Sequence, residues 1–162
     1  MSNRARLIIL CGLPGSGKTT LGKSFEARLG AVRLSADEWM DAIEVDLWDE
    51  DKRARIETLQ WSVAQRLLDL GMIVIIEWGT WSRSERDSLR MGARALHAAV
   101  ELHYVFAPPE VLLERIERRA MEDPPITREH LTEWSRLFEV PTEAELALYD
   151  KPLIADAVTG SE

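Results

Sequence analysis

One short segment constrains the fold of this chain more than any other. Residues 12–19 read Gly-Leu-Pro-Gly-Ser-Gly-Lys-Thr, directly after the apolar run Leu7–Cys11 and directly before a stretch of helical period. Glycines adopt backbone conformations that other residues avoid, so such a loop can turn tightly between a strand and a helix. A strand, a loop and a helix in this order are the repeating unit of a parallel sheet covered by helices. The segment therefore predicts an α/β fold.

The rest of the chain repeats this alternation of short apolar runs and longer helical segments. Apolar residues at spacings of three and four from Ile56 to Leu70 predict a helix that Gly71 stops, and another helix is predicted before Gly30. Strands are predicted at five runs, namely Leu7–Cys11, Ala31–Leu34, Met72–Ile76, Val100–Phe106 and Pro152–Ala155. This pattern is typical of a parallel sheet between helices.

Helix starts and breaks give the organisation of the chain. Three Ser or Thr residues stand three positions before a glutamate, as in a capping box: Ser35 with Glu38, Ser82 with Glu85 and Thr142 with Glu145. Pro124-Pro125 divides a charged helical stretch, so a helix-loop-helix excursion is predicted at about 109–139. A length of 162 residues suits one domain. We expect that domain at 1–158 and a flexible tail at 159–162.

The charge, cysteine content and apolar stretches of the chain indicate which partners and which compartment to expect. The chain has 28 acidic and 20 basic residues, a net charge of -8, so long nucleic acid is a less favoured partner because phosphate backbones are met by basic surfaces. The single cysteine, Cys11, excludes an intramolecular disulfide and fits the reducing cytoplasm. No stretch approaches the roughly 20 apolar residues that a membrane span needs. We expect a cytoplasmic protein without a membrane contact, and its oligomeric state stays open.

The glycine-rich segment also carries chemistry, because it matches G-x-x-x-x-G-K-[ST] in full. Its backbone N–H groups can wrap a phosphate at a helix N-terminus, Lys18 can neutralise the β- and γ-phosphates, and the Thr19 hydroxyl can ligate Mg²⁺. A dinucleotide-binding pattern fails, because Thr20 stands where the third glycine is needed. The expected nucleotide-binding residues are Gly12, Leu13, Pro14, Gly15, Ser16, Gly17, Lys18, Thr19 and Thr20.

Further segments follow the loop in a recognisable order, namely Leu34-Ser-Ala-Asp37, Ile75-Ile-Glu-Trp-Gly-Thr80, Val105-Phe-Ala-Pro-Pro-Glu110, Leu113-Glu-Arg115 and Arg119. From about Leu7 to Glu145 the chain resembles the small P-loop kinase family of AAA-type kinases, which includes polynucleotide 5′-hydroxyl kinases, zeta toxins and chloramphenicol phosphotransferase. The resemblance implies a three-layer αβα sandwich, a five-stranded mostly parallel sheet of order 2-3-1-4-5, and a short helical lid at about 109–139. It also implies transfer of the γ-phosphate of Mg·ATP to a hydroxyl.

Catalytic roles come from the same resemblance. Asp37, nineteen residues beyond Lys18, would orient and deprotonate the acceptor hydroxyl, although aspartate is also favoured in the first turn of any helix. Arg115 and Arg119 lie four residues apart on one helix face and would reach over the phosphates with Lys18. The alternative for these arginines is a solvated helix with weak ion pairs to its own glutamates.

Glu77 has two open roles. It ends a predicted strand, where P-loop proteins often place the carboxylate that holds magnesium through water. In the zeta toxins a similar Glu-Gly-Thr sequence faces the acceptor instead, and here Trp78 is inserted between Glu77 and Gly79. The insertion leaves the matching role of Thr80 open.

The acceptor cleft is expected to hold several of the six tryptophans. Four of them follow Asp37 or flank Gly79 and Thr80, at strand ends and helix starts that are natural cleft walls. Trp61 and Trp134 are expected to fill the core, which is the alternative for the others too. Arg83 is a candidate to hold an anionic part of the acceptor. The expected acceptor-binding residues are Trp39, Trp48, Glu77, Trp78, Thr80, Trp81 and Arg83.

An acidic run between residues 41 and 51 bears on the acceptor's charge. It holds Asp41, Glu44, Asp46, Asp49, Glu50 and Asp51 with no basic residue among them. It is either a solvated face or the rim of the cleft, where it would attract a cationic, antibiotic-like acceptor. The favoured function is an ATP-dependent kinase for such a small molecule. The alternatives are a polynucleotide or oligonucleotide 5′-hydroxyl kinase, and a nucleotide-dependent switch or NTPase without an acceptor.

Overall fold

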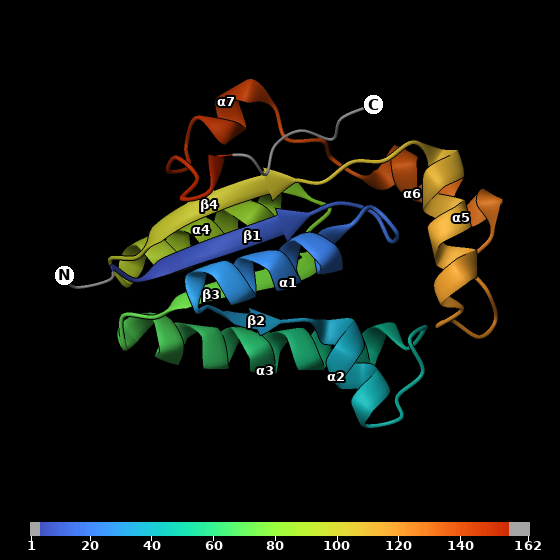
Figure 1. The fold of residues 1–162 in the computed structure, drawn as a ribbon, viewed down its shortest axis with the longest axis horizontal. Coiled ribbons are helices and arrows are strands. Elements are labelled where there is room, and N and C mark those ends of the chain that lie inside the picture. The colour runs from blue at the N-terminus through green and yellow to red at the C-terminus, as the bar shows by residue number, and fades with distance from the viewer. Residues whose placement is uncertain (1–3, 156–162) are drawn as a thin grey trace.

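A parallel sheet of four strands carries the fold (Figure 1). The computed structural model describes residues 4–155, so the tail predicted at 159–162 lies outside the described residues. The strands are β1 (Arg6–Cys11), β2 (Val32–Leu34), β3 (Ile73–Gly79) and β4 (Ala99–Tyr104). The helices are α1 (Lys18–Leu29), α2 (Ala36–Ala42), α3 (Glu50–Asp69), α4 (Arg83–Ala95), α5 (Pro109–Arg119), α6 (Arg128–Leu137) and α7 (Glu143–Leu146).

The strand order is β2-β3-β1-β4, and each neighbouring pair is parallel. In the register, Ile8 of β1 lies opposite Ile75 of β3 and opposite Glu101 of β4. The α/β class and the order of the first four strands are confirmed. Because all four strands run the same way, the loops that follow them gather at one edge of the sheet, where ligands bind in open α/β sheets.

The fifth strand predicted at Pro152–Ala155 is wrong. The chain does return to β4, but the contact is made mostly by side chains: the Asp150 carboxylate accepts from the Val100 N–H at 2.8 Å, and the Leu153 N–H donates to the Glu101 carboxylate at 2.9 Å. Pro152 has no N–H to give to a ladder. An apolar run after a turn therefore lies against the sheet edge without extending it.

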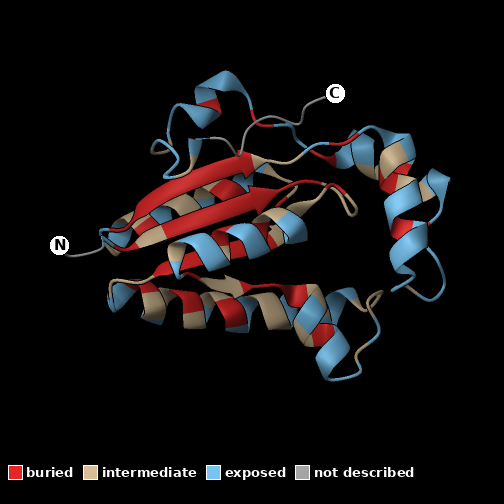
Figure 2. Ribbon diagram, viewed as in Figure 1, coloured by how far each residue is buried: buried red, intermediate tan, exposed pale blue. Residues whose placement is uncertain are grey.

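Helices cover both faces of the sheet, as the three-layer prediction expects. On one face, Phe25 of α1 packs against Ile8, Leu10 and Ile75. On the other face, residues of α3 and α4 pack against alternate side chains of the same strands, in a cluster that includes Ala64, Leu68, Leu89, Ala93, Leu7, Ile9, Val74 and Val100. The strands β1, β3 and β4 are buried almost throughout, whereas β2 at the edge is only partly buried (Figure 2). Of these, β1 and β3 supply apolar side chains to both layers.

The helices α5 and α6 lie beyond the carboxyl edge of the sheet (Figure 1). They have a small apolar cluster of their own, which includes Leu112, Ile116 and Leu131. This pair is the predicted helix-loop-helix excursion. Within residues 4–155, no helix has both the length and the apolar character needed to cross a membrane.

The three predicted caps are confirmed. Ser35, Ser82 and Thr142 each accept a hydrogen bond from the backbone N–H three residues later. Two of the glutamates at those positions bind arginines in addition: Glu38 accepts from Arg33 at 2.8 Å, and Glu145 accepts from the fully buried Arg86 at 2.6 Å. These side chains therefore join separate elements.

Candidate active site

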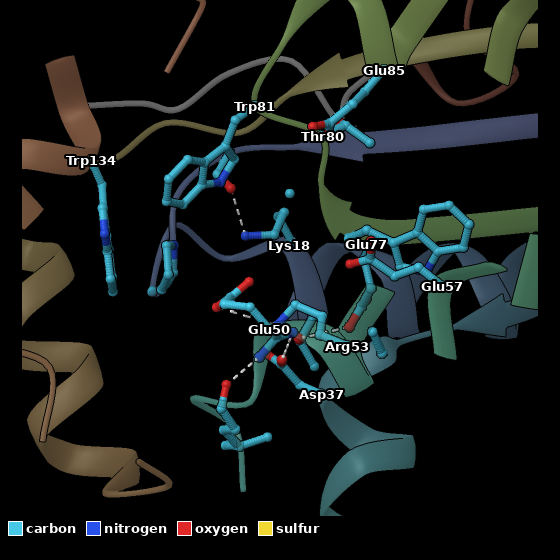
Figure 3. Close-up of a pocket in the computed structure, with 18 of the residues that line it drawn as sticks. Lys18, Asp37, Glu50, Arg53, Glu57, Glu77, Thr80, Trp81, Glu85 and Trp134 are labelled. Atoms are coloured by element: carbon cyan, nitrogen blue, oxygen red, sulfur yellow. Dashed lines mark hydrogen bonds and ion pairs between the residues drawn. The ribbon is translucent and has the colours of Figure 1, made fainter. Parts of the chain in front are cut away.

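A single cavity of about 1370 Å³ opens at the carboxyl edge of the sheet. Its walls come from the glycine-rich loop and α1, from α2, α3 and the segment between them, from the end of β3, from α4, and from α5 and α6. Figure 3 shows these walls, with Lys18 between Asp37 on one side and Trp81 on the other. The cavity brings together residues that are more than a hundred positions apart in the sequence, from Gly12 to Trp134.

The glycine-rich loop forms a cradle of backbone. Gly15 and Gly17 have φ angles of 79° and 109°, which favour glycine. A Cβ on Gly12 would overlap the Val105 carbonyl oxygen, and one on Gly15 would lie 2.8 Å from the Leu112 carbonyl oxygen. The loop ends at the N-terminus of α1, where the helix dipole favours an anion. This geometry fits a bound phosphate.

Lys18 spans the loop from inside. Its Nζ donates to the carbonyl oxygens of Gly12 and Leu13, both at 2.9 Å. Burial lowers the pKa of Lys18 to about 8, although the carboxylates of Asp37 and Glu77 act in the opposite direction. A poorly hydrated ammonium group beside a phosphate cradle is well placed to gain a strong interaction with an anion.

Thr19 and Glu77 form the second part of the loop site. The Thr19 hydroxyl donates to Glu77 Oε1 at 3.0 Å. The Glu77 side chain is 2% exposed, and its other oxygen, Oε2, has no partner among residues 4–155. A Cβ on Gly22 would lie 2.7 Å from Oε2, so a glycine in α1 leaves room for this carboxylate. A hydroxyl and a carboxylate side by side are the oxygen ligands that Mg²⁺ prefers, so these residues fit that ion.

Arg33 holds Glu77 in place, and the sequence analysis missed it. Its Nη1 donates to Glu77 Oε1 at 3.1 Å, and its Nη2 donates to both carboxylate oxygens of Glu38 at 2.8 Å. The Arg33 side chain is only 7% exposed. The one signal in the sequence was an arginine inside the apolar run Ala31–Leu34. Arg33 thus connects the strand-end carboxylate with the helix that carries Asp37.

Asp37 lies in the first turn of α2 and lines the cavity. Its Oδ1 accepts a hydrogen bond from Arg53 Nη1 at 2.5 Å, while Arg53 Nη2 donates to the Leu47 carbonyl oxygen at 2.7 Å. The Asp37 side chain remains 43% exposed. Arg53, on α3, was not expected from the sequence, because helical spacing alone does not say which helix faces α2.

The two candidate lid arginines, Arg115 and Arg119 of α5, both line the cavity. Arg115 Nη1 donates to the carbonyl oxygens of Gly15 and Ser16 at 3.1 Å, so it lies directly over the glycine-rich loop. Arg119 pairs with Glu122 at 2.5 Å. The structure thus brings these arginines to the loop of Lys18.

Five tryptophans line the cavity. Trp48, Trp78 and Trp81 line the cavity as expected, but so do Trp61 and Trp134, which were assigned to the core. The ring centroid of Trp134 lies 6.1 Å from that of Trp48 and 5.7 Å from that of Trp81. Helical spacing could not reveal this, because a cavity wall and a core both need apolar residues on one helix face.

Two of the expected acceptor residues lie elsewhere. Trp39 packs against the main hydrophobic core, and Arg83 forms a 3.5 Å ion pair with Asp87 on α4. Neither is among the described residues that line the cavity. Thr80 does line it, with its hydroxyl buried and without a partner in the described part of the chain.

Most of the acidic run from residue 41 to residue 51 lies outside the cavity. Of its six carboxylates only Glu50 is among the lining residues, and Asp49 caps α3 by accepting from the Lys52 N–H at 3.0 Å. Other carboxylates take its place in the cavity, namely Glu57 and Glu85. Burial raises the pKa of Glu57 to about 7, and the charges of Glu85, Glu50 and Asp37 add to this effect against that of Arg53.

The parallel sheet, the glycine-rich loop with Lys18 and Thr19, the strand-end carboxylate and the lid arginines together define a P-loop protein of the small kinase class. The chain belongs to the AAA domain family, whose model matches residues 7–141. This confirms the resemblance stated from the sequence.

Several known proteins are similar to this chain. A shikimate kinase from Bradyrhizobium diazoefficiens is 28% identical over 120 residues, which cover 72% of this chain and 56% of that protein. A gluconokinase from Arabidopsis thaliana is 28% identical over 131 residues, which cover 73% of this chain and 69% of that protein. A chain of the Pnkp1/Rnl/Hen1 RNA repair complex superposes with a TM-score of 0.70 at 22% identity, covering 99% of this chain and 51% of that chain. This last likeness shows the fold alone.

Proposed function

We propose that the protein is an ATP-dependent kinase that transfers the γ-phosphate of Mg·ATP to a hydroxyl group of a small-molecule acceptor. The observation that carries this proposal is that Lys18 of the phosphate loop and Asp37, the candidate base, line one cavity. A shikimate kinase and a gluconokinase among the relatives support a hydroxyl acceptor. The chain spans 56% of the length of that shikimate kinase, so the likeness supports the reaction class only.

Asp37 acts as the general base in this proposal. Arg53 holds Oδ1, and within residues 4–155 Oδ2 has no hydrogen-bond partner. The acceptor hydroxyl gives its proton to Oδ2 while its oxygen forms a bond to the γ-phosphorus. The bond between that phosphorus and the β–γ bridging oxygen breaks, and ADP leaves.

The remaining loop and lid residues stabilise charge. Lys18 would exchange its contacts to Gly12 and Leu13 for the β- and γ-phosphates, and Arg115 and Arg119 would meet the transferring group from the lid. Thr19 and, through water, Glu77 would hold Mg²⁺, which supplies charge neutralisation at the phosphates when bound.

A small and cationic acceptor suits the cavity better than a polynucleotide end. A nucleic acid needs a basic channel. Among residues 4–155, only four basic residues line the cavity: Lys18, Arg53, Arg115 and Arg119. Lys18 belongs to the phosphate loop, Arg53 is paired with Asp37, and the other two lie on the lid. The described lining holds six acidic residues, namely Asp37, Glu50, Glu57, Glu77, Glu85 and Glu122. The shape shared with the RNA repair chain is the observation that favours the polynucleotide alternative.

Incubation with γ-labelled ATP and a panel of hydroxylated amines, sugars, nucleosides and oligonucleotides tests the proposal. We expect label on a small acceptor and a rate lower by about 10³ in Asp37→Asn, the size of a lost general base, with ATP binding retained. Asp41→Asn, which changes the same group on α2 outside the cavity, is the control. Labelled oligonucleotide would favour the polynucleotide alternative, and inorganic phosphate alone would favour an NTPase.

A further inference from the structure

The cavity continues beyond the candidate reaction centre, between the middle of α3 and the first two turns of α4. This part, called the amine groove below, is lined by Glu57, Thr58 and Trp61 of α3 and by Ser84, Glu85, Ser88 and Leu89 of α4. The Trp61 ring reaches across to α4, where a Cβ on Gly92 would lie 2.7 Å from its Cζ2. A glycine in α4 therefore leaves space for the tryptophan that connects the two helices.

The amine groove holds negative charge that the chain does not neutralise. Of the six carboxylates in the described lining, four pair with arginines: Asp37 and Glu50 with Arg53, Glu77 with Arg33, and Glu122 with Arg119. Glu57 and Glu85 form no ion pair within residues 4–155. Glu57 is half-buried, so its ionised form is poorly hydrated as well as unpaired, and its pKa rises to about 7. An ammonium group beside Glu57 would favour the ionised form.

A second observation points to a ligand at this place. Thr80 is 3% exposed, its hydroxyl has no hydrogen-bond partner in the described chain, and it lines the same cavity. Figure 3 places Thr80 next to Glu85, on the side of the cavity away from Trp134. A buried hydroxyl without a partner costs free energy unless a ligand or water satisfies it.

The remaining lining adds aromatic and hydroxyl groups. Trp61 and Trp78 present rings that attract cations, and three hydroxyl side chains can bind the hydroxyls of a sugar or similar ring, namely Thr58, Ser84 and Ser88. Carboxylates together with indole rings are the chemistry that recognises an ammonium group.

We infer that the amine groove binds an ammonium group of the acceptor, with Glu57 and Glu85 as its counter-charges, so that the acceptor is a hydroxylated amine such as an amino sugar. This inference rests on the proposed kinase function and assigns the acceptor's charge to two residues on α3 and α4. It moves the attraction for a cation away from the acidic run at 41–51.

Binding of glucosamine and of kanamycin tests the inference without any catalysis. Each is compared with its N-acetylated derivative, in which acetylation has removed the ammonium charge. Tryptophan fluorescence reports the binding, because five tryptophans line the cavity. We expect the charged forms to bind, and Glu57→Gln to weaken them about tenfold, with a smaller loss for the more exposed Glu85→Gln. Asp51→Asn removes one charge from the same helix outside the cavity, and should leave the affinity unchanged.

The inference is overturned if no charged probe binds saturably, if the acetylated forms bind equally well, or if Asp51→Asn weakens binding as much as Glu57→Gln. Failure here is separable from failure of the proposed function. Phosphoryl transfer to an uncharged hydroxyl compound, without amine binding, would contradict the amine groove and support the proposed kinase function. Amine binding that depends on Glu57, without phosphoryl transfer to any acceptor, would support the amine groove and contradict the proposed kinase function.

Discussion

The two ends of the cavity are built in different ways. The nucleotide end is built around one continuous segment, residues 12–19, whose backbone forms the cradle and which carries Lys18 and Thr19. Glu77 and Arg115 lie against this segment. The acceptor end consists of side chains from segments that are far apart in the sequence, among them Trp48, Glu57, Trp81 and Trp134. A local site tolerates little change in any residue, whereas a composite site can change its ligand one side chain at a time.

Among the substitutions that distinguish the nucleotide end from the acceptor end, that of Lys18 should have the largest effect on activity. In Lys18→Ala we expect the rate of phosphoryl transfer to fall by about 10³, as for the loss of a charge that stabilises a transition state. ATP affinity should fall too, because Lys18 lies in the cradle. Isothermal titration with ATP and with a cationic acceptor measures both ends. Unchanged ATP affinity would break the assignment of this end to the nucleotide.

Arg33 should matter to the nucleotide end without touching the nucleotide. Arg33→Met removes the donor that holds Glu77 Oε1, so we expect the Mg²⁺ dependence of ATP binding to weaken by 10-fold to 100-fold, about the range for groups that support a metal ligand. ATP binding without Mg²⁺ should stay the same. Arg33→Lys should retain part of the effect, and the exposed Arg28→Met should show none. Equal Mg²⁺ dependence in all four proteins would remove the role of Arg33.

The cluster of Trp48, Trp81 and Trp134 allows a test of the acceptor end alone. Trp134→Leu removes a ring that packs against Trp48 and Trp81, so we expect the KM for the acceptor to rise about tenfold with an unchanged KM for ATP. Trp39→Leu, at a tryptophan outside the cavity, is the control and should leave both constants in place. A rise in the KM for ATP alone would contradict the division of the cavity.

The smallest expected effect is a pH dependence at Glu57. Its pKa is about 7 when folded against 4.5 when exposed, so the folded chain holds a proton that the unfolded chain releases, and the stability from that proton is lost as the pH rises through 7. Glutamine cannot ionise. Thermal unfolding should therefore show Glu57→Gln more stable than the parent by about 1 kcal/mol at about pH 8, with the gap closing towards pH 4.5. A stability difference between the two proteins that does not change with pH would contradict the raised pKa of Glu57.

The glycine-rich loop at the nucleotide end could be predicted from the sequence, but Arg33, which holds Glu77, could not. The loop, its lysine and its threonine are adjacent in the chain, so spacing alone determines their geometry. The order of the first four strands followed from the family resemblance. The fifth strand failed because apolar character at Pro152–Ala155 does not reveal how this segment meets β4. There the Asp150 carboxylate accepts from the Val100 N–H, and the Glu101 carboxylate accepts from the Leu153 N–H, in place of a backbone ladder.

The acceptor end could be predicted only in part. Trp48, Trp78 and Trp81 were predicted because they stand near strand ends and helix starts, which the fold brings to the cavity. Arg53 and Glu57 escaped because their role depends on which face of α3 meets α2 and α4, and one sequence does not contain that packing. The sequence left the acidic run open between a solvated face and the rim of the cleft. Only Glu50 of the run lines the cavity, because charges that are close in sequence are not therefore close to the ligand.

The most direct test of the central claim, that one cavity joins a nucleotide to an acceptor hydroxyl, is the ratio of phosphorylated acceptor to ADP formed. Mass spectrometry of the acceptor and chromatography of the nucleotide measure it with Mg·ATP and a hydroxylated amine. We expect equal amounts of the two products, and the loss of both in Asp37→Asn. ADP that accumulates with inorganic phosphate, at the same rate with or without an acceptor and with or without the Asp37 carboxylate, would contradict it.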